Sequence, residues 1–283
     1  ADPNVPNLRN ILTFEFFLDA NLAQQNPITW GGVMRVLPPQ LLDQSQTRFI
    51  EVIVQGDRGR LHIDLGSLSE DVIPNGRLDT EDRLVNGFRD GIADPDEDVG
   101  LDGERKPDPP SLNFPRDNFV GQSIAEIPYD FWDVNGNGVK DEDEPWSYDD
   151  WSYTEQRPFI YIHADGKGSI SGTEGNAVEE SGLIADSEDL NRNNAVDLVD
   201  QYFSFSFSLS KSSPDTALIV GGNPDKGWFI YRVPFSSDSA DAVIGGRQAL
   251  SNIEFVRVWF DHLSSNGVSD KISIAQINFV DSE

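Results

Sequence analysis

The side chains of residues 133–144 carry oxygen atoms at the spacing that is typical of an EF-hand calcium loop. Acidic and amide side chains stand at alternate positions, Gly138 permits the sharp turn, a backbone carbonyl follows it, and a glutamate closes the loop. The expected ligands are Asp133, Asn135, Asn137, the Val139 carbonyl, Asp141 and Glu144. This pattern predicts a bound Ca²⁺ ion.

A second loop, residues 189–200, repeats the pattern with two changes. Asn194 replaces the usual glycine, and asparagine tolerates the left-handed backbone conformation. Asp200 replaces the closing glutamate, which shortens the reach of that carboxylate and weakens the expected binding. The expected ligands are Asp189, Asn191, Asn193, the Ala195 carbonyl, Asp197 and Asp200.

Two further acidic stretches match the pattern less closely. In residues 71–82 the side chain of Ile73 cannot act as a ligand, and the expected ligands are Asp71, Asn75, the Arg77 carbonyl, Asp79 and Asp82. Residues 90–104 have no EF-hand register, so they form an irregular site, complete a neighbouring site, or are a solvated acidic turn. Their candidate ligands are Asp94, Asp96, Asp98 and Asp102.

None of these loops is flanked by the amphipathic helices of a calcium sensor, so we expect structural calcium sites that do not act as a switch. The loops resemble those of dockerin and thrombospondin-type repeats.

The composition is strongly acidic, with 49 acidic against 21 basic residues and a net charge of -28. Such a charge argues against binding to nucleic acids or anionic membrane surfaces, which need a basic face. The sequence has no cysteine, so calcium would take the place of disulfides in stabilising the loops. No segment is apolar and long enough to insert into a bilayer. We expect an extracellular or cell-surface location, where calcium is plentiful.

The sequence does not predict an enzyme. The histidines His62, His163 and His262 lack zinc-site spacing, and no nucleophile elbow, phosphate-binding loop or dinucleotide fingerprint is present. A glycosidase pair chosen from so many carboxylates has no specificity. We therefore assign no catalytic residues.

Aromatic residues cluster directly after the first calcium loop, at Trp146, Tyr148, Trp151 and Tyr153. Aromatic rings stack on the faces of sugars, so these four residues form a candidate glycan-binding site. Alternatively, the rings cover a hydrophobic core, which is the commoner role of tryptophan.

The elements that position these loops are predicted to be short strands with turns between them. Residues 201–210 place Phe203, Phe205, Phe207 and Leu209 on one face and serines on the other, as in a half-buried antiparallel strand. Residues 48–55 and 60–65 are predicted to form a hairpin around the turn 56–59. The other expected strands are residues 11–20, 158–163, 217–220, 228–234, 253–262 and 271–280. This pattern predicts an all-β fold, an antiparallel β-sandwich of jelly-roll type.

The domain organisation follows from where the strand pattern stops. We expect an extended tail at residues 1–10 and a single sandwich domain at residues 11–283. Residues 66–153 are dominated by Asp, Glu, Gly, Pro and Asn and are too long for a plain loop, which predicts an acidic insertion ordered by calcium.

Several segments resemble the SprA-like cell-surface proteins of gliding motility and type IX secretion. The run 61–76 (LHIDLGSLSEDVIPNG) is similar to a segment of that family, as are the acidic loop with its following strand at 188–203 and the strands at 228–234, 253–260 and 274–277. The resemblance implies an extracellular or periplasmic jelly-roll domain. Members of the family are very large outer-membrane translocon components, whereas this chain has 283 residues. Thr216 and Ser239 also match the short acceptor pattern for bacterial O-glycosylation.

Three functions remain open from the sequence. The first is a secreted, calcium-stabilised structural or adhesive protein that self-associates into a fibre by donating strand 11–20 to a neighbour, unless that strand completes its own sandwich. The second is a calcium-dependent carbohydrate-binding module. The third, implied by the resemblance alone, is a domain of a secretion or motility apparatus.

Overall fold

The computed structural model describes residues 11–16, 30–82, 88–92, 97, 101, 185–246, 249–263 and 270–281. The chain divides into two compact units, the first being Ala1–Leu68 together with Val199–Glu283, and the second Ser69–Leu198. All the named strands lie in the first unit. None of the helices in the described ranges is long and apolar enough to cross a membrane.

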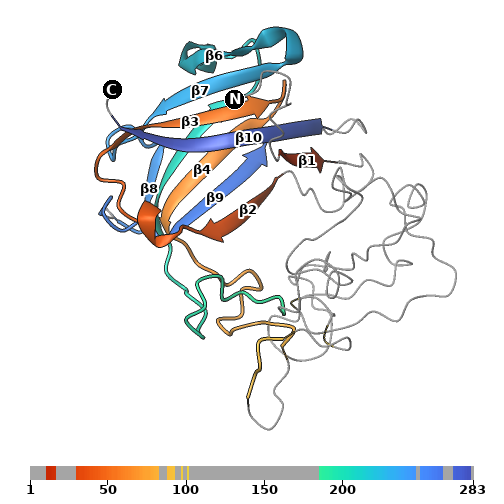
Figure 1. The fold of residues 1–283 in the computed structure, drawn as a ribbon, viewed down its shortest axis with the longest axis vertical. Helices are drawn as coiled ribbons and strands as arrows, with labels where there is room; N and C mark the ends of the chain where they lie inside the picture. Colours follow the sequence, from red (N-terminus) through yellow and green to blue (C-terminus); the bar gives the residue numbers. More distant parts are fainter. Residues whose placement is uncertain are drawn as a thin grey trace, which may run out of the picture. The chain divides into compact units, whose positions relative to one another are not determined.

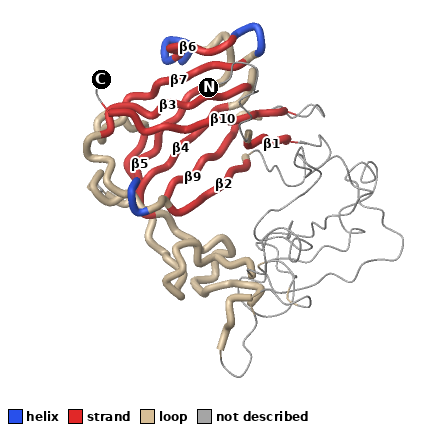
Figure 2. The backbone as a smooth tube through the Cα atoms, in the orientation of Figure 1, coloured by secondary structure: helices blue, strands red, loops and turns tan. Residues whose placement is uncertain are grey.

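In the described residues, the first unit contains two five-stranded antiparallel sheets, which form the two layers in Figure 1. Sheet A has the order β1 (Leu12–Phe16), β10 (Asp270–Asp281), β3 (Thr47–Gln55), β7 (Trp228–Pro234) and β6 (Ile219–Asn223). Sheet B has the order β2 (Gly31–Val36), β9 (Phe255–Asp261), β4 (Arg60–Ser67), β5 (Gln201–Ser208) and β8 (Ala242–Ile244). Short 3-10 helices, η1 (Pro39–Leu41), η4 (Pro214–Leu218) and η5 (Pro224–Lys226), connect the strands and are the blue segments of Figure 2.

The strand pairing is that of a long hairpin rolled up on itself. The outermost strands pair with each other, β1 with β10, and then β2 with β9, β3 with β7 and β4 with β5. This nesting is the topology of a jelly roll. The fold class predicted from the sequence, an antiparallel β-sandwich of jelly-roll type, is therefore confirmed.

The core lies between the inner faces of the two sheets. Alternate residues of the central strands are fully or nearly fully buried: Ile50, Val52 and Val54 of β3, Leu61, Ile63 and Leu65 of β4, and Phe203, Phe205 and Phe207 of β5. Phe207 stacks on Tyr231 of the opposite sheet, with ring centroids 4.3 Å apart. Each such side chain stabilises the fold by roughly 1.5–3 kcal/mol through burial.

The predicted hairpin of residues 48–55 and 60–65 is wrong. Both segments are strands, but β3 pairs with β10 and β7 in sheet A, whereas β4 pairs with β9 and β5 in sheet B. The turn carries the chain from one layer to the other because both strands have an apolar face to bury. Gly56 permits this crossing, since a Cβ atom there would lie 3.1 Å from the Leu209 side chain.

Strand β1 completes the edge of sheet A in its own chain. It pairs with residues 270–274 of β10, Thr13 and Ser273 join their hydroxyls at 2.9 Å, and the Phe14 ring lies 4.9 Å from that of Phe260. It begins within the predicted strand 11–20, of which residues 17–20 lie outside the described part of the chain.

The connection between β4 and β5, which contains the predicted insertion 66–153, leaves and re-enters sheet B at one ladder position. Strands β4 and β5 pair along their whole length, so the last residue of β4, Ser67, is opposite the first residue of β5, Gln201. The loop that begins at Asp71 and the loop that ends at Asp200 therefore both lie in the connection between β4 and β5, the innermost strands of the rolled hairpin.

Candidate metal centre

The structure describes two of the predicted calcium loops, residues 71–82 and 189–200. The loop at 133–144, the aromatic cluster at Trp146, Tyr148, Trp151 and Tyr153, and the candidate ligands Asp94, Asp96, Asp98 and Asp102 lie outside the described residues.

The two described loops begin with the same turn. The carboxylate of Asp71 accepts hydrogen bonds from the backbone N–H groups of Asn75 and Gly76, at 3.3 and 3.1 Å. The carboxylate of Asp189 accepts the equivalent bonds from Asn193 and Asn194, at 2.9 and 2.7 Å.

The sixth residue of each loop is left-handed, with φ of 72° at Gly76 and 66° at Asn194. Asparagine therefore replaces glycine at this position, as the sequence predicts.

Each loop brings its ninth residue toward an amide side chain. Asn75 donates a hydrogen bond from Nδ2 to Oδ2 of Asp79, and Asn191 donates one from Nδ2 to Oδ2 of Asp197, each at 2.7 Å. In this arrangement the amide nitrogens, not the amide oxygens, face the carboxylates. Binding of a cation by these amides requires that they turn over.

Two glutamates that the sequence analysis did not select join the loops reciprocally. The carboxylate of Glu188, which precedes the second loop, accepts backbone N–H bonds from Val72, Ile73 and Asp79 of the first loop, at 2.7, 2.9 and 3.1 Å.

The carboxylate of Glu70, which precedes the first loop, accepts the matching bonds from Leu190, Asn191 and Asp197 of the second loop, at 2.9, 3.1 and 3.2 Å. Both glutamates are buried, Glu70 at 0% and Glu188 at 2% exposure. We call this reciprocal arrangement of Glu70 and Glu188 the glutamate clasp.

The backbone supports the same pairing. Glu70 N–H donates to the Asp197 carbonyl at 2.8 Å, and Glu188 N–H donates to the Asp79 carbonyl at 3.1 Å. Beyond the clasp, Thr80 and Ser187 form an isolated antiparallel bridge, and Asp186 N–H donates to the Glu81 carboxylate at 2.9 Å. The two loops are therefore one hydrogen-bonded unit related by an approximate two-fold symmetry.

A repeated sequence motif could have indicated the clasp. Residues 69–79 and 187–197 share Ser-Glu-Asp at their start, an asparagine at the seventh position and an aspartate at the eleventh. The serine has the same role in both copies, because Ser69 Oγ accepts from Asp71 N–H and Ser187 Oγ from Asp189 N–H, at 3.3 and 3.2 Å.

Burial makes the negative charge of this unit costly. Burial raises the pKa of Glu188 to about 7, and the N–H bonds from Ile73, Asp79 and Val72 offset only part of that effect. Burial also raises the pKa of Glu70 and of Asp79. The nearby carboxylate of Asp71 raises the pKa of Asp79 further, so the charges within one loop repel each other.

The donor chemistry of the loops is suited to a hard cation. Within the described ranges, no three His, Asp or Glu side chains gather into a metal-binding group. The carboxylates of Asp71 and Asp79 in the first loop are near enough to repel each other, and the carboxylate, amide and carbonyl oxygens of both loops are the ligand types that Ca²⁺ accepts. The closing residue of the first loop, Asp82, instead accepts a hydrogen bond from Gly91 N–H at 2.6 Å.

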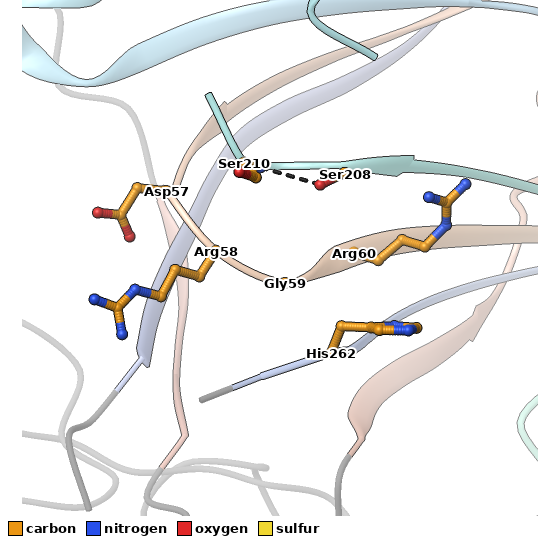
Figure 3. Close-up of a pocket in the computed structure, with 7 residues that line it drawn as sticks. All are labelled: Asp57, Arg58, Gly59, Arg60, Ser208, Ser210 and His262. Carbon is orange, nitrogen blue, oxygen red and sulfur yellow. Dashed lines mark hydrogen bonds between the residues drawn. The ribbon is translucent and has the colours of Figure 1, made fainter. Parts of the chain in front are cut away.

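A surface pocket of about 650 Å³ lies at the turn between β3 and β4 (Figure 3). Its lining residues are Asp57, Arg58, Gly59, Arg60, Ser208, Ser210 and His262. Arg60 pairs with Asp215 at 3.6 Å, and His262 bonds to Asp261 at 2.7 Å. Burial acts to raise the pKa of Asp261, but the bonds from His262 and His62 outweigh it and the pKa lies below its ordinary value. Nothing in the described residues indicates catalysis.

The two candidate glycosylation sites differ in their surroundings. Thr216 is exposed and donates its hydroxyl to the Ser213 carbonyl at 3.0 Å. The Ser239 hydroxyl donates to the Pro234 carbonyl at 2.9 Å and closes a turn with Ser236. A glycan on Ser239 would break this turn, so Thr216 is the better candidate.

No protein-family model matches the chain, and a search of curated proteins finds no similar sequence.

We predict that Glu188 gives the metal-free protein a characteristic pH dependence. Because its folded-state pKa of about 7 lies above the ordinary value of 4.5, the folded protein binds this proton more readily than the unfolded protein does. The contribution of Glu188 to the free energy of unfolding is therefore greatest below pH 4.5, and it is lost as the pH rises through 7. Its size is at most about 3 kcal/mol.

Urea unfolding in the presence of chelator, repeated between pH 4.5 and 7, measures this dependence. The uncharged variant Glu188→Gln should lose less stability over this range than the wild type. Asp225→Asn, which changes an exposed carboxylate on η5, is the control and should behave as the wild type. Parallel curves for Glu188→Gln and the wild type would show that the clasp does not titrate.

Proposed function

We propose that this chain is a secreted, calcium-stabilised β-sandwich with a structural or adhesive role at the cell surface. The main support is the glutamate clasp, which joins two loops of EF-hand-like spacing into one symmetric unit. Paired calcium loops that support each other in this way are expected of structural sites. The resemblance to SprA-like surface proteins supports the cell-surface location.

The proposed ligands are the oxygens that the loop register supplies. In the first loop they are Asp71, Asn75, the Arg77 carbonyl, Asp79 and Asp82, and in the second Asp189, Asn191, Asn193, the Ala195 carbonyl, Asp197 and Asp200. A bound Ca²⁺ ion would supply the positive charge that offsets the repulsion among these carboxylates. The glutamates of the clasp do not bind the ion but hold the backbone of the partner loop.

The expected calcium affinity of the loops and the acidic composition of the chain both support an extracellular setting. Loops with few carboxylates and a shortened closing residue bind calcium weakly, and extracellular modules work with dissociation constants of about 10⁻⁴–10⁻³ M. Such sites fill where calcium is abundant. A net charge of -28 also disfavours close approach to nucleic acids and anionic lipids.

Self-association into a fibre is part of this proposal. Among the described residues, strand β1 occupies an edge of sheet A and pairs with β10 on one side only. A β1 strand from a neighbouring copy would find the same ladder and the same contact with Phe260. Exchange of β1 between copies would propagate head to tail.

Calcium should stabilise the protein through both described loops. At a calcium concentration a hundredfold above the dissociation constant, one site adds about 2.7 kcal/mol to the free energy of unfolding. We expect Asp189→Asn to remove one equivalent of bound calcium and its share of the stabilisation, because it removes the charge of the first ligand. Titration calorimetry and thermal unfolding with calcium and with chelator measure both effects.

Lys226→Gln, which changes an exposed charge on η5, is the control for the calcium titration and should bind the wild-type number of ions. Unchanged stoichiometry in Asp189→Asn would refute the assignment of this loop. Equal melting temperatures with calcium and with chelator would refute calcium stabilisation as a whole.

If the protein forms a fibre, the size of its particles in solution should depend on β1, the donated strand. We expect light scattering and negative-stain microscopy to show filaments in calcium, and Thr13→Pro to prevent them because proline is disfavoured in a paired strand. A monodisperse monomer, with and without chelator, would exclude the fibre and leave the sandwich as a solitary surface domain.

A further inference from the structure

The outer face of sheet B carries a linked set of aromatic and charged side chains. On β4, Leu61, Ile63 and Leu65 point into the core, so His62 and Asp64 point outward. The strand register places Trp259 of β9 opposite His62, and Arg257 opposite Asp64. The same face carries Trp30, which directly precedes β2, and Tyr202 of β5. We call the set Trp30, His62, Asp64, Tyr202, Arg257 and Trp259 the indole–guanidinium face.

Asp64 is the centre of this set and is unusual for an outward-facing residue. It is only 1% exposed, and its Oδ2 atom accepts bonds from Trp259 Nε1 and from Nε and Nη2 of Arg257, all at 2.8 Å. Its Oδ1 atom is buried and has no hydrogen-bond partner.

A buried oxygen without a partner costs stability. A small polar residue at this position would avoid that cost, so the arrangement points to a role other than folding.

The carboxylate holds two planar groups in place, and their neighbours complete the arrangement. The Trp259 indole stacks on the His62 ring, with centroids 3.6 Å apart and an angle of 10°. Trp30 meets the same indole edge-on, at 6.4 Å and 83°. The Arg257 guanidinium lies over the Tyr202 ring at 5.0 Å. Trp259 and Arg257 are thus held in place before any ligand arrives, which lowers the entropy lost on binding.

The face is open to a ligand at Trp30 and Arg257. Trp30 is 59% exposed, and the Arg257 side chain is 31% exposed. Gly32 keeps the backbone of β2 close to Trp259, because a Cβ atom at Gly32 would approach Trp259 to under 3.0 Å.

Among the six residues of this face, the one guanidinium, that of Arg257, pairs with the one carboxylate, that of Asp64, at 2.8 Å. In a chain with a net charge of -28, the face therefore has no excess charge with which to attract an ion. It offers flat apolar rings beside guanidinium N–H donors, a combination that matches a neutral ligand with an apolar face and a rim of hydroxyl groups.

We propose that the indole–guanidinium face binds a neutral saccharide. The sugar ring stacks on Trp30 against the edge of Trp259, and the exposed N–H groups of Arg257 donate to its hydroxyls. Asp64 is a positioning residue, since its burial keeps it from touching the sugar. The inference does not rest on calcium binding, because all six residues belong to the sandwich unit, whereas the calcium loops up to Leu198 belong to the other unit.

Native affinity electrophoresis of the full chain tests the proposal, with soluble neutral glucan, mannan, xylan and galactan in the gel and polygalacturonate as the anionic counterpart. We expect at least one neutral polysaccharide to retard the wild type equally in calcium and in chelator. Trp30→Ala should weaken the binding at least about tenfold, as loss of an aromatic anchor does. Phe88→Ala removes an exposed ring (78% exposed) in the other unit and should bind as the wild type.

Asp64→Asn tests the positioning role separately. It should weaken binding and also change the near-ultraviolet circular dichroism of the unliganded protein, because Trp259 and Arg257 lose their charged anchor. The proposal is overturned if no neutral polysaccharide retards the wild type, if only polygalacturonate does, or if Trp30→Ala binds normally. A Trp30→Ala variant that sediments as a monomer while the wild type sediments as a dimer would overturn it too, because the face would then be an interface between copies.

Discussion

Two buried carboxylates hold the acidic part of this protein together. Glu70 and Glu188 each accept three backbone N–H bonds from the loop that the other one precedes. Hydrogen bonds to a charged acceptor are about twice as strong as neutral ones, and a buried N–H group that lost its partner would cost about 1–3 kcal/mol. Each loop therefore stabilises the backbone of the other, and a cation that orders one loop acts on both.

The jelly roll explains how two loops so distant in sequence meet. The sheet pairs β4 with β5 up to Ser67 and Gln201, so the chain leaves and re-enters the sandwich at one ladder position. The insertion can then be long, because the cost of closing a loop grows slowly with its length. A few residues further along, the hydrogen bond from Glu70 N–H to the Asp197 carbonyl brings the two arms of this connection together again. The sandwich provides the stability that the acidic loops lack, since it buries the apolar side chains of the central strands.

Residue patterns predicted the strands better than their pairing. Strand β7 coincides with the prediction, and Phe203, Phe205 and Phe207 alternate into the core as expected, because a half-buried strand imposes a period of two. Strand pairing depends on whether a turn keeps the chain in one sheet or takes it to the other. The local residue pattern does not show this, so β3 and β4 were wrongly predicted to form a hairpin. Strand β2 was missed because Gly31 and Gly32 have no side chains to show an alternation.

Local residue patterns also predicted part of the candidate metal centre. Ligand spacing is a local property, so it indicated both described loops as candidate calcium sites, which stays a prediction, and the left-handed conformation of Asn194 was expected from its position. The clasp depends on a contact between segments far apart in sequence, and only the repeated Ser-Glu-Asp motif signals it. The indole–guanidinium face likewise draws its residues from several strands of sheet B, and Asp64 gains its role only when Arg257 and Trp259 lie beside it.

The central claim is that the two loops form one unit that responds to calcium together. Hydrogen exchange of the backbone N–H groups that the clasp binds tests it directly: those of Val72, Ile73 and Asp79 in one loop, and of Leu190, Asn191 and Asp197 in the other. The account predicts that calcium slows exchange at both sets in parallel, and that Glu188→Gln speeds exchange at both. Protection of one set without the other, or exchange that ignores calcium in both, would contradict it.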